Sequence, residues 1–204
     1  VYDLTQSSSY LGYIGFAGGM PAWLFTLYGG VVADHVSRRT LIMITQTVMM
    51  LLAFVLAGLV FTNLIQPWHI ILLAFLLGVT NSFDITARQA FLTELVPRED
   101  LTNAIALGST LFNLALIVGP VIAGFTYALV GPAWCFAFNG ISFLGVIVAL
   151  LLMKLPPPQI KPRTGSVFSD LSAGYEYVRA DESIVILLIG RVVMGIFLMG
   201  FLSL

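Results

Sequence analysis

Charged side chains are scarce in this chain of 204 residues. Asp, Glu, Lys and Arg together make up 9% of it, whereas 59% of the residues are hydrophobic. A soluble domain carries about 25% charged residues. So few charges cannot cover the surface of a water-soluble fold, and so apolar a composition is also unlike that of a disordered chain. The composition therefore predicts a membrane protein.

Other residue types are scarce as well, and their scarcity argues against several functions. The single cysteine, Cys135, cannot form an internal disulfide, and two distant histidines are too few for a His-rich metal site. A net charge of −1 does not suit a nucleic-acid binder, which needs a basic face. The sequence lacks the ATP-binding motif Gly-x-x-x-x-Gly-Lys-(Ser/Thr). We therefore expect no enzyme, no metal and no cofactor, and an ion or substrate gradient as the energy source.

Long apolar runs are what the sequence has in abundance. A helix crosses the bilayer core with about 20 apolar residues. Apolar residues that follow one another without interruption indicate helices, whereas the strands of a membrane barrel alternate apolar and polar residues. Six runs reach this length, at about residues 10–30, 40–61, 68–88, 103–130, 134–153 and 184–204. The predicted fold class is therefore all-α, a polytopic bundle of transmembrane helices.

The runs also suggest a domain organisation. Residues 1–153 form one transmembrane bundle, residues 154–183 a linker, and residues 184–204 begin a second bundle. Apolar residues recur at helical spacing over about residues 166–180 of the linker. This segment is either an amphipathic helix on the membrane surface or a helix packed as a spacer. We expect the chain to be part of a longer protein.

Basic residues alternate from loop to loop. Lys and Arg occur in or beside the connections at 31–39, 89–102 and 154–183, and they are absent from the two connections between these. The positive-inside rule places the three basic loops in the cytoplasm. Trp68 and Trp134 begin runs at the opposite face, where interfacial aromatic residues are expected.

The first basic loop carries a recognisable motif. Residues 30–39 read Gly-Val-Val-Ala-Asp-His-Val-Ser-Arg-Arg. This resembles the signature loop of the major facilitator superfamily, Gly-x-x-x-Asp-(Arg/Lys)-x-Gly-(Arg/Lys)-(Arg/Lys), and the matching residues are Gly30, Asp34, Arg38 and Arg39. Two positions depart from it, because His35 replaces a basic residue and Ser37 replaces a glycine.

Two further stretches resemble one branch of that superfamily, which contains enterobactin-type and macrolide-type exporters. Residues 81–90 read Asn-Ser-Phe-Asp-Ile-Thr-Ala-Arg-Gln-Ala. Residues 119–124 resemble the exporter signature Gly-Pro-x-x-Gly-Gly; Gly119, Pro120 and Gly124 match it, whereas Ala123 replaces a glycine.

The resemblance implies a secondary transporter of the plasma membrane. The chain would be the N-terminal half of the major facilitator fold without its first helix, plus the start of the second half. We expect a monomeric, proton-coupled exporter of amphipathic drugs or siderophores that works by alternating access, an antiporter of the multidrug-resistance type. Its partners would be the substrate, the bilayer and the rest of the same chain. An uncoupled permease or importer, and a non-transporting membrane protein that keeps the fold, remain alternatives.

The resemblance also implies roles for particular residues. Gating of the cytoplasmic side would involve Gly30, Asp34, Arg38, Arg39, Asp84 and Arg88. Asp84 is a candidate partner for Arg38, and it shares a helix face with Arg88 four residues later. The alternative is that Arg38 and Arg39 only determine topology. The exporter motif would form a kinked, closely packed helix, or simply a small-residue packing face.

Isolated polar residues inside the runs are candidates for the substrate path. These are Asn81, Asn113 and Arg191. The alternatives are helix–helix hydrogen bonds for the asparagines, and for Gln46 as well, and snorkelling to the interface for Arg191. Asp84 is expected near the inner face, so that a proton-coupling acid would lie in another part of the protein.

Overall fold

The structure is a computed structural model that describes residue 5, residues 7–153, and residues 185, 186 and 190. The predicted linker helix and most of the sixth apolar run, including Arg191, lie outside these residues. The chain divides into two compact units, residues 1–161 and 162–204, and every helix named below belongs to the first. The backbone of α2 is described throughout, but some of its side chains are not: Trp23, Thr26, Leu27, Val31, Ala33, Asp34 and His35.

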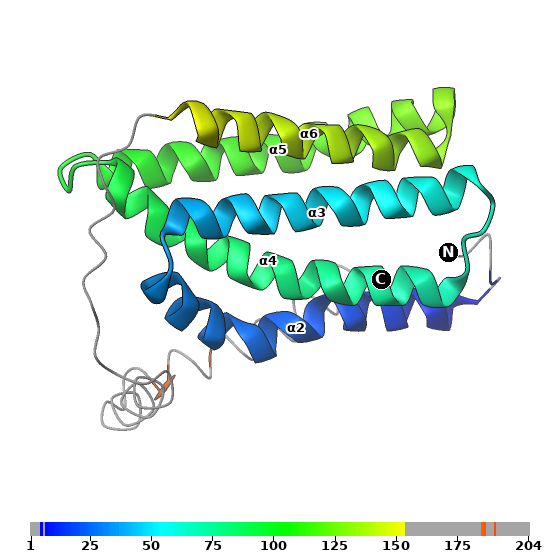
Figure 1. The fold of residues 1–204 in the computed structure, drawn as a ribbon, viewed down its shortest axis with the longest axis horizontal. Helices are drawn as coiled ribbons and strands as arrows, with labels where there is room; N and C mark the ends of the chain where they lie inside the picture. Colours follow the sequence, from blue (N-terminus) through cyan, green and yellow to red (C-terminus); the bar gives the residue numbers. More distant parts are fainter. Residues whose placement is uncertain (1–4, 6, 154–184, 187–189, 191–204) are drawn as a thin grey trace. The chain divides into compact units, whose positions relative to one another are not determined.

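The described residues of the first unit form five long helices (Figure 1). They are α2 (Ser8–His35), α3 (Arg38–Phe61), α4 (Pro67–Leu95), α5 (Leu101–Val130) and α6 (Pro132–Leu152). Each of the first five apolar runs lies within one of them to within one residue. Helices α3 to α6 are long and apolar enough to cross a membrane. The predicted all-α bundle of transmembrane helices is confirmed.

Local sequence signals account for the helix ends. Ser37 caps α3, because its side chain accepts a hydrogen bond from the Thr40 backbone N–H. This is a structural reason for a serine where the signature loop has glycine. Pro67 and Pro132 occupy the first positions of α4 and α6, where a missing N–H costs nothing. Gly131 turns the chain between α5 and α6 with a φ of 85°, which favours glycine.

The helices pack in the order α2, α4, α3, α6 and α5, each against the next (Figure 1). A buried cluster joins α3, α4 and α6: Leu41, Ile42, Ala87, Phe91 and Leu150. Helix α5 has no buried residue and contacts mainly α6. Helix α2 contains Pro21 and is visibly curved, as an internal proline explains (Figure 1).

Small residues bring α2 and α4 close together. A Cβ atom added at Gly78 of α4 would meet the carbonyl oxygen of Gly18 and, at 3.1 Å, Cγ of Pro21. At the other end of the contact, a Cβ atom at Gly29 would lie 3.3 Å from the Ser82 carbonyl oxygen. This contact therefore depends on glycine at two levels.

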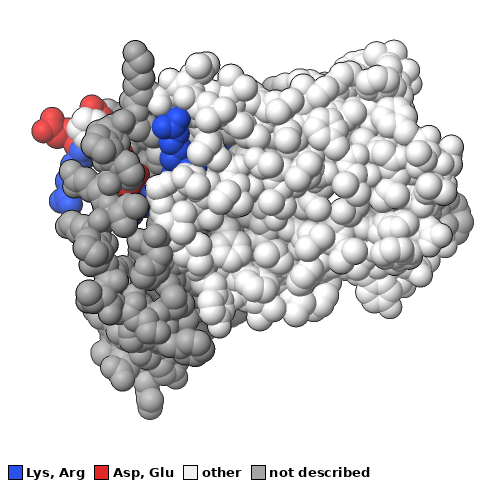
Figure 2. Space-filling model, viewed as in Figure 1, with Lys and Arg blue, Asp and Glu red and all other residues white. Residues whose placement is uncertain are grey.

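Charged side chains gather at one end of the bundle. On the face drawn in Figure 2, the coloured Lys, Arg, Asp and Glu atoms lie at the end where α3 begins and α4 ends, and the other described atoms of that face are white. The connections at 36–37 and 96–100 both lie at this end. The alternation of basic and uncharged loops in the sequence thus corresponds to two chemically different ends of one bundle.

Candidate functional site

A carboxylate is buried between two apolar helices. Asp84 of α4 is 5% exposed and lies against α3, beside Thr45 and Gln46, which are equally buried. A charged or polar group placed among membrane helices is costly unless other groups hydrogen-bond to it. Its burial makes Asp84 the first place to look for a site.

Three side chains hydrogen-bond to Asp84. Thr45 Oγ1 donates to Oδ1 over 2.6 Å, and Gln46 Nε2 donates to the same oxygen over 2.9 Å. Arg88, one turn further along α4, donates from Nε to Oδ2 over 2.6 Å and forms an ion pair. We call Thr45, Gln46, Asp84 and Arg88 the Asp84 cluster. It ties α3 to α4 through bonds to a charged acceptor, which are stronger than neutral ones.

The Asp84 cluster lies inside the predicted membrane region. Along α3, Thr45 is seven residues from Arg38, or about 10 Å at 1.5 Å per residue. Along α4, Asp84 is ten residues from Glu94, or about 15 Å. Asp84 therefore lies about 10–15 Å from the charged ends of α3 and α4, because α4 continues for seven residues beyond the apolar run that ends at Arg88.

A second ion pair lies at the charged end of the bundle. Arg38, the first residue of α3, donates from one guanidinium nitrogen to Glu94 Oε1 over 2.9 Å and to the Ala90 carbonyl oxygen over 3.0 Å. Arg39 donates to the carbonyl oxygen of Leu151 over 3.1 Å, at the end of α6. The two arginines therefore connect the start of α3 to the ends of α4 and α6.

The arrangement differs in one respect from the prediction. Asp84 was the expected partner of Arg38, but Arg38 contacts Glu94, and the charged group that contacts Asp84 is Arg88. The two pairs lie at different levels of the bundle, since Arg88 and Glu94 are six residues apart along α4. Of the other residues predicted to act in gating, Gly30 lies beside Thr86, because a Cβ atom added at Gly30 would be 4.0 Å from Cγ2 of Thr86. The side chain of Asp34 lies outside the described residues.

The exporter motif lies on the uncovered helix. Pro120 is inside α5, and a Cβ atom added at Gly119 or Gly124 meets nothing within 4 Å in the described part of the chain. Asn113 on α5 and Asn81 on α4 are both exposed. These residues are not brought together with the Asp84 cluster by the described structure.

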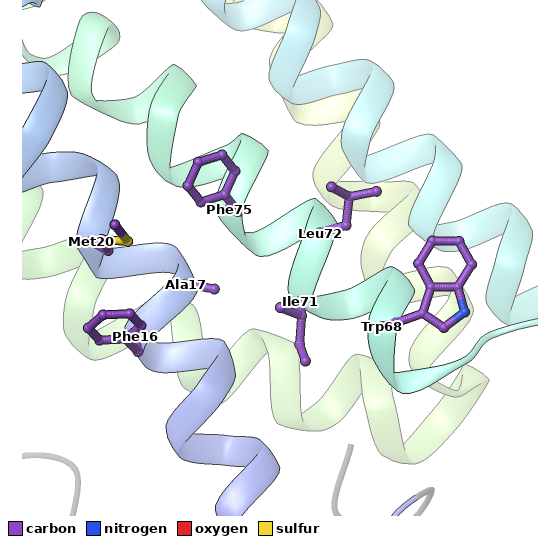
Figure 3. A pocket seen from close by; sticks show the side chains of 7 residues that line it. All are labelled: Phe16, Ala17, Met20, Trp68, Ile71, Leu72 and Phe75. Carbon is purple, nitrogen blue, oxygen red and sulfur yellow. The ribbon is translucent and has the colours of Figure 1, made fainter.

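An apolar pocket of about 370 Å³ lies between α2 and α4, away from the Asp84 cluster. Figure 3 shows the side chains that line it, which are Phe16, Ala17 and Met20 of α2 and Trp68, Ile71, Leu72 and Phe75 of α4. The indole N–H of Trp68 donates to the side chain of Gln66, at the start of α4. None of the residues predicted to form a site lines this pocket.

The sequence alone did not identify two residues of the site. Glu94 is one of several acidic residues near Arg98, and Thr45 is one of many threonines in apolar runs. Neither has a sequence signal that distinguishes it from its neighbours. Their roles depend on which face of α3 and α4 meets the other helix, which one sequence does not reveal.

Comparison with known proteins gives consistent matches. The chain matches the model of the family described as transmembrane secretion effector over residues 1–204. It is 25% identical over 175 residues to the Staphyloferrin A transporter of Staphylococcus aureus (strain NCTC 8325 / PS 47), covering 85% of this chain and 44% of that protein.

Two further relatives are exporters by name. The chain is 32% identical over 166 residues to Enterobactin exporter EntS of Shigella boydii serotype 18 and to its counterpart in Escherichia coli O1:K1 / APEC. These matches cover 76% of this chain and 37% of each relative. The matched part of the chain thus spans less than half the length of these relatives. No solved structure matches.

Proposed function

We propose a transport function from one premise: the chain belongs to the transmembrane secretion effector family of the major facilitator superfamily. It is a multi-pass membrane protein of a transporter family. Our proposal is that the complete protein is a secondary active exporter in the plasma membrane. It moves amphipathic small molecules outward by alternating access, with the proton gradient as the source of energy.

The observation that carries this proposal is that α3 and α4 are connected at two different levels of the bundle. The Asp84 cluster joins α3 to α4 within the membrane region, and Arg38–Glu94 joins the same helices at their charged ends. Rocking of helix bundles needs contacts that hold in one state and release in another. Partly exposed ion pairs suit this, because their net strength is small. Arg38 and Glu94 are 24% and 48% exposed.

The substrate class follows from the relatives. Their printed names refer to staphyloferrin A and enterobactin, and we extend this class to the present chain as a siderophore or an amphipathic drug. The uncovered, apolar α5 supports a second bundle facing this one. The exporter motif at Gly119, Pro120 and Gly124 would pack there, and Asn81, Asn113 and Arg191 would line the path between the halves.

The proposed orientation puts the charged end of the bundle in the cytoplasm. Loops 31–39, 89–102 and 154–183 would then be cytoplasmic, and Trp68 would lie near the outer surface. In this orientation the Arg38–Glu94 pair lies on the side from which an exporter takes up its substrate.

Inside-out vesicles test the function. The full-length protein is expressed in a host lacking its own siderophore exporters, and labelled enterobactin is added with or without an acid-inside proton gradient. We expect accumulation that depends on the gradient and stops with a protonophore. Uptake of enterobactin that is the same with and without the gradient favours an uncoupled permease. The proposal is contradicted if vesicles with the wild-type protein take up no more enterobactin, and no more of a macrolide, than vesicles without it.

A further inference from the structure

We propose that Asp84 is a proton-binding site and that the Thr45 hydroxyl group allows it to exist in two protonation states. The proton-binding step stands on the geometry of the Asp84 cluster, and its use in transport rests on the proposed function. The sequence analysis placed a coupling acid in another part of the protein. The structure instead offers a buried carboxylate within this chain.

The decisive feature is that Thr45 faces two acceptors. Its Oγ1 lies 2.6 Å from Asp84 Oδ1 and 2.9 Å from the Ile42 carbonyl oxygen. A hydroxyl group has one proton and two lone pairs, so it donates to one of these oxygens at a time. The choice between them depends on whether Asp84 carries a proton.

In the ionised state Thr45 and Gln46 both donate to Oδ1, and Arg88 donates to Oδ2. When a proton from water binds Oδ1, the new O–H bond donates to Thr45 Oγ1. Thr45 then turns its own proton to Ile42. Gln46 still donates to Oδ1, now a hydroxyl oxygen, and Arg88 still donates to Oδ2. Both carboxylate oxygens of Asp84 thus keep their hydrogen-bond partners in either state, and no heavy atom has to move.

The surroundings leave Arg88 as the charge that balances Asp84. Among the described side chains, it is the charged group in contact with Asp84. On α3, Arg38 and Arg39 contact Glu94 and Leu151 instead. Helices α5 and α6 contain no Asp, Glu, His, Lys or Arg. Helix α2 also contains Asp34 and His35, whose side chains are not described.

Proton binding changes the connection between α3 and α4. The bond from Gln46 goes from a charged acceptor to a neutral one, and the Thr45 bond becomes a neutral one that Asp84 donates; neutral hydrogen bonds are about half as strong as charged ones. The side chain of Arg88 is 47% exposed, so it has room to turn away once Asp84 is neutral. A proton on Asp84 therefore loosens the cluster and favours a state in which the two helices move apart.

Infrared difference spectroscopy of the full-length protein in lipid tests proton binding directly. Acidification should produce the C=O band of a buried carboxylic acid. Asp84→Asn should remove this band, and the matched control Asp100→Asn, on an exposed residue before α5, should keep it. Persistence of the band in Asp84→Asn overturns the proposal.

Thr45 gives a second test that does not remove the carboxylate. Thr45→Val takes away the acceptor for the acid proton, so the band should move to higher frequency. Thr47→Val is the matched control, because Thr47 donates to the Met43 carbonyl oxygen of the same helix without contacting Asp84. Identical spectra for Thr45→Val and the wild type overturn the role of Thr45.

Transport assays separate this inference from the proposed function. In vesicles, Asp84→Asn should keep enterobactin exchange but lose its gradient-driven accumulation, and Thr45→Val should lower accumulation about fivefold, the equivalent of one hydrogen bond. If the wild type shows the Asp84 band but no gradient-driven accumulation, the proposed function is contradicted and the proton site remains supported. Gradient-driven accumulation of enterobactin by the Asp84→Asn variant overturns the inference.

Discussion

At the scale of single residues, burial decides how much an ion pair matters. Asp84 is buried and Arg88 is half exposed, whereas both Arg38 and Glu94 are partly exposed. Exposed pairs typically contribute about 0–1 kcal/mol, but removing one partner of a buried pair leaves a charge that nothing compensates. The two pairs of this bundle should therefore respond differently to mutation.

The first prediction concerns Arg88. Arg88→Ala leaves the Asp84 charge with two neutral donors and should destabilise the protein by about 1–2 kcal/mol, below the 3–5 kcal/mol of a fully buried pair because Arg88 is half exposed. Adding Asp84→Asn should restore part of the loss. Denaturant unfolding of the two single variants and the double variant measures this. Purely additive effects would show that the pair is not coupled.

The second prediction concerns Arg38 and Glu94. A double-mutant cycle with Arg38→Ala and Glu94→Ala should give a coupling energy of about 1 kcal/mol or less, and it should shrink at high salt, since exposed charges are screened. The same unfolding measurements at two ionic strengths test it. A larger coupling that salt does not change would mean that the pair is buried in the complete protein.

At the scale of the helices, the sequence predicts the membrane segments well and their contacts poorly. Hydropathy is a property of each segment by itself, which explains why the apolar runs lie within α2 to α6. The partner of Arg38 depends on the rotation of α3 relative to α4, so that Glu94 could not be identified in advance.

The contact between α2 and α4 gives the third prediction. Gly78→Ala places a methyl group against the Gly18 carbonyl oxygen, so it should destabilise the protein by about 1–3 kcal/mol through overpacking. Gly108→Ala, on the open face of α5, should be neutral or stabilising, because alanine is the better helix former. Thermal unfolding followed by circular dichroism compares them. Equal melting temperatures would mean that α2 and α4 are not so close.

At the scale of the whole molecule, α5 stands out because none of its residues is buried in the described bundle. The superfamily resemblance in residues 30–39 could be recognised from the sequence, and the family match confirms it. What covers α5 could not be deduced from the sequence, and it lies beyond the described contacts. The exposed α5 is nevertheless where the exporter motif lies, and this placement leads to a prediction about function.

The fourth prediction is that Gly119 matters for transport but not for folding. A Cβ atom added at Gly119 meets no described atom within 4 Å, so the expression and melting temperature of Gly119→Leu should stay near those of the wild type. Transport should be lost if α5 packs closely on the second bundle. Gly145→Leu, which is equally open on α6, serves as the control. Normal enterobactin transport by Gly119→Leu would contradict this role.

The orientation of the charged end is the claim on which the gating pair and the use of Asp84 in transport both depend. It can be tested after Cys135, the one natural cysteine, is replaced by alanine. Single cysteines are then placed at Ser37, between α2 and α3, and at Leu64, which is 64% exposed between α3 and α4. In intact cells, a membrane-impermeant thiol reagent should label position 64 and spare position 37 until the membrane is opened. Labelling of position 37 from outside would contradict the account.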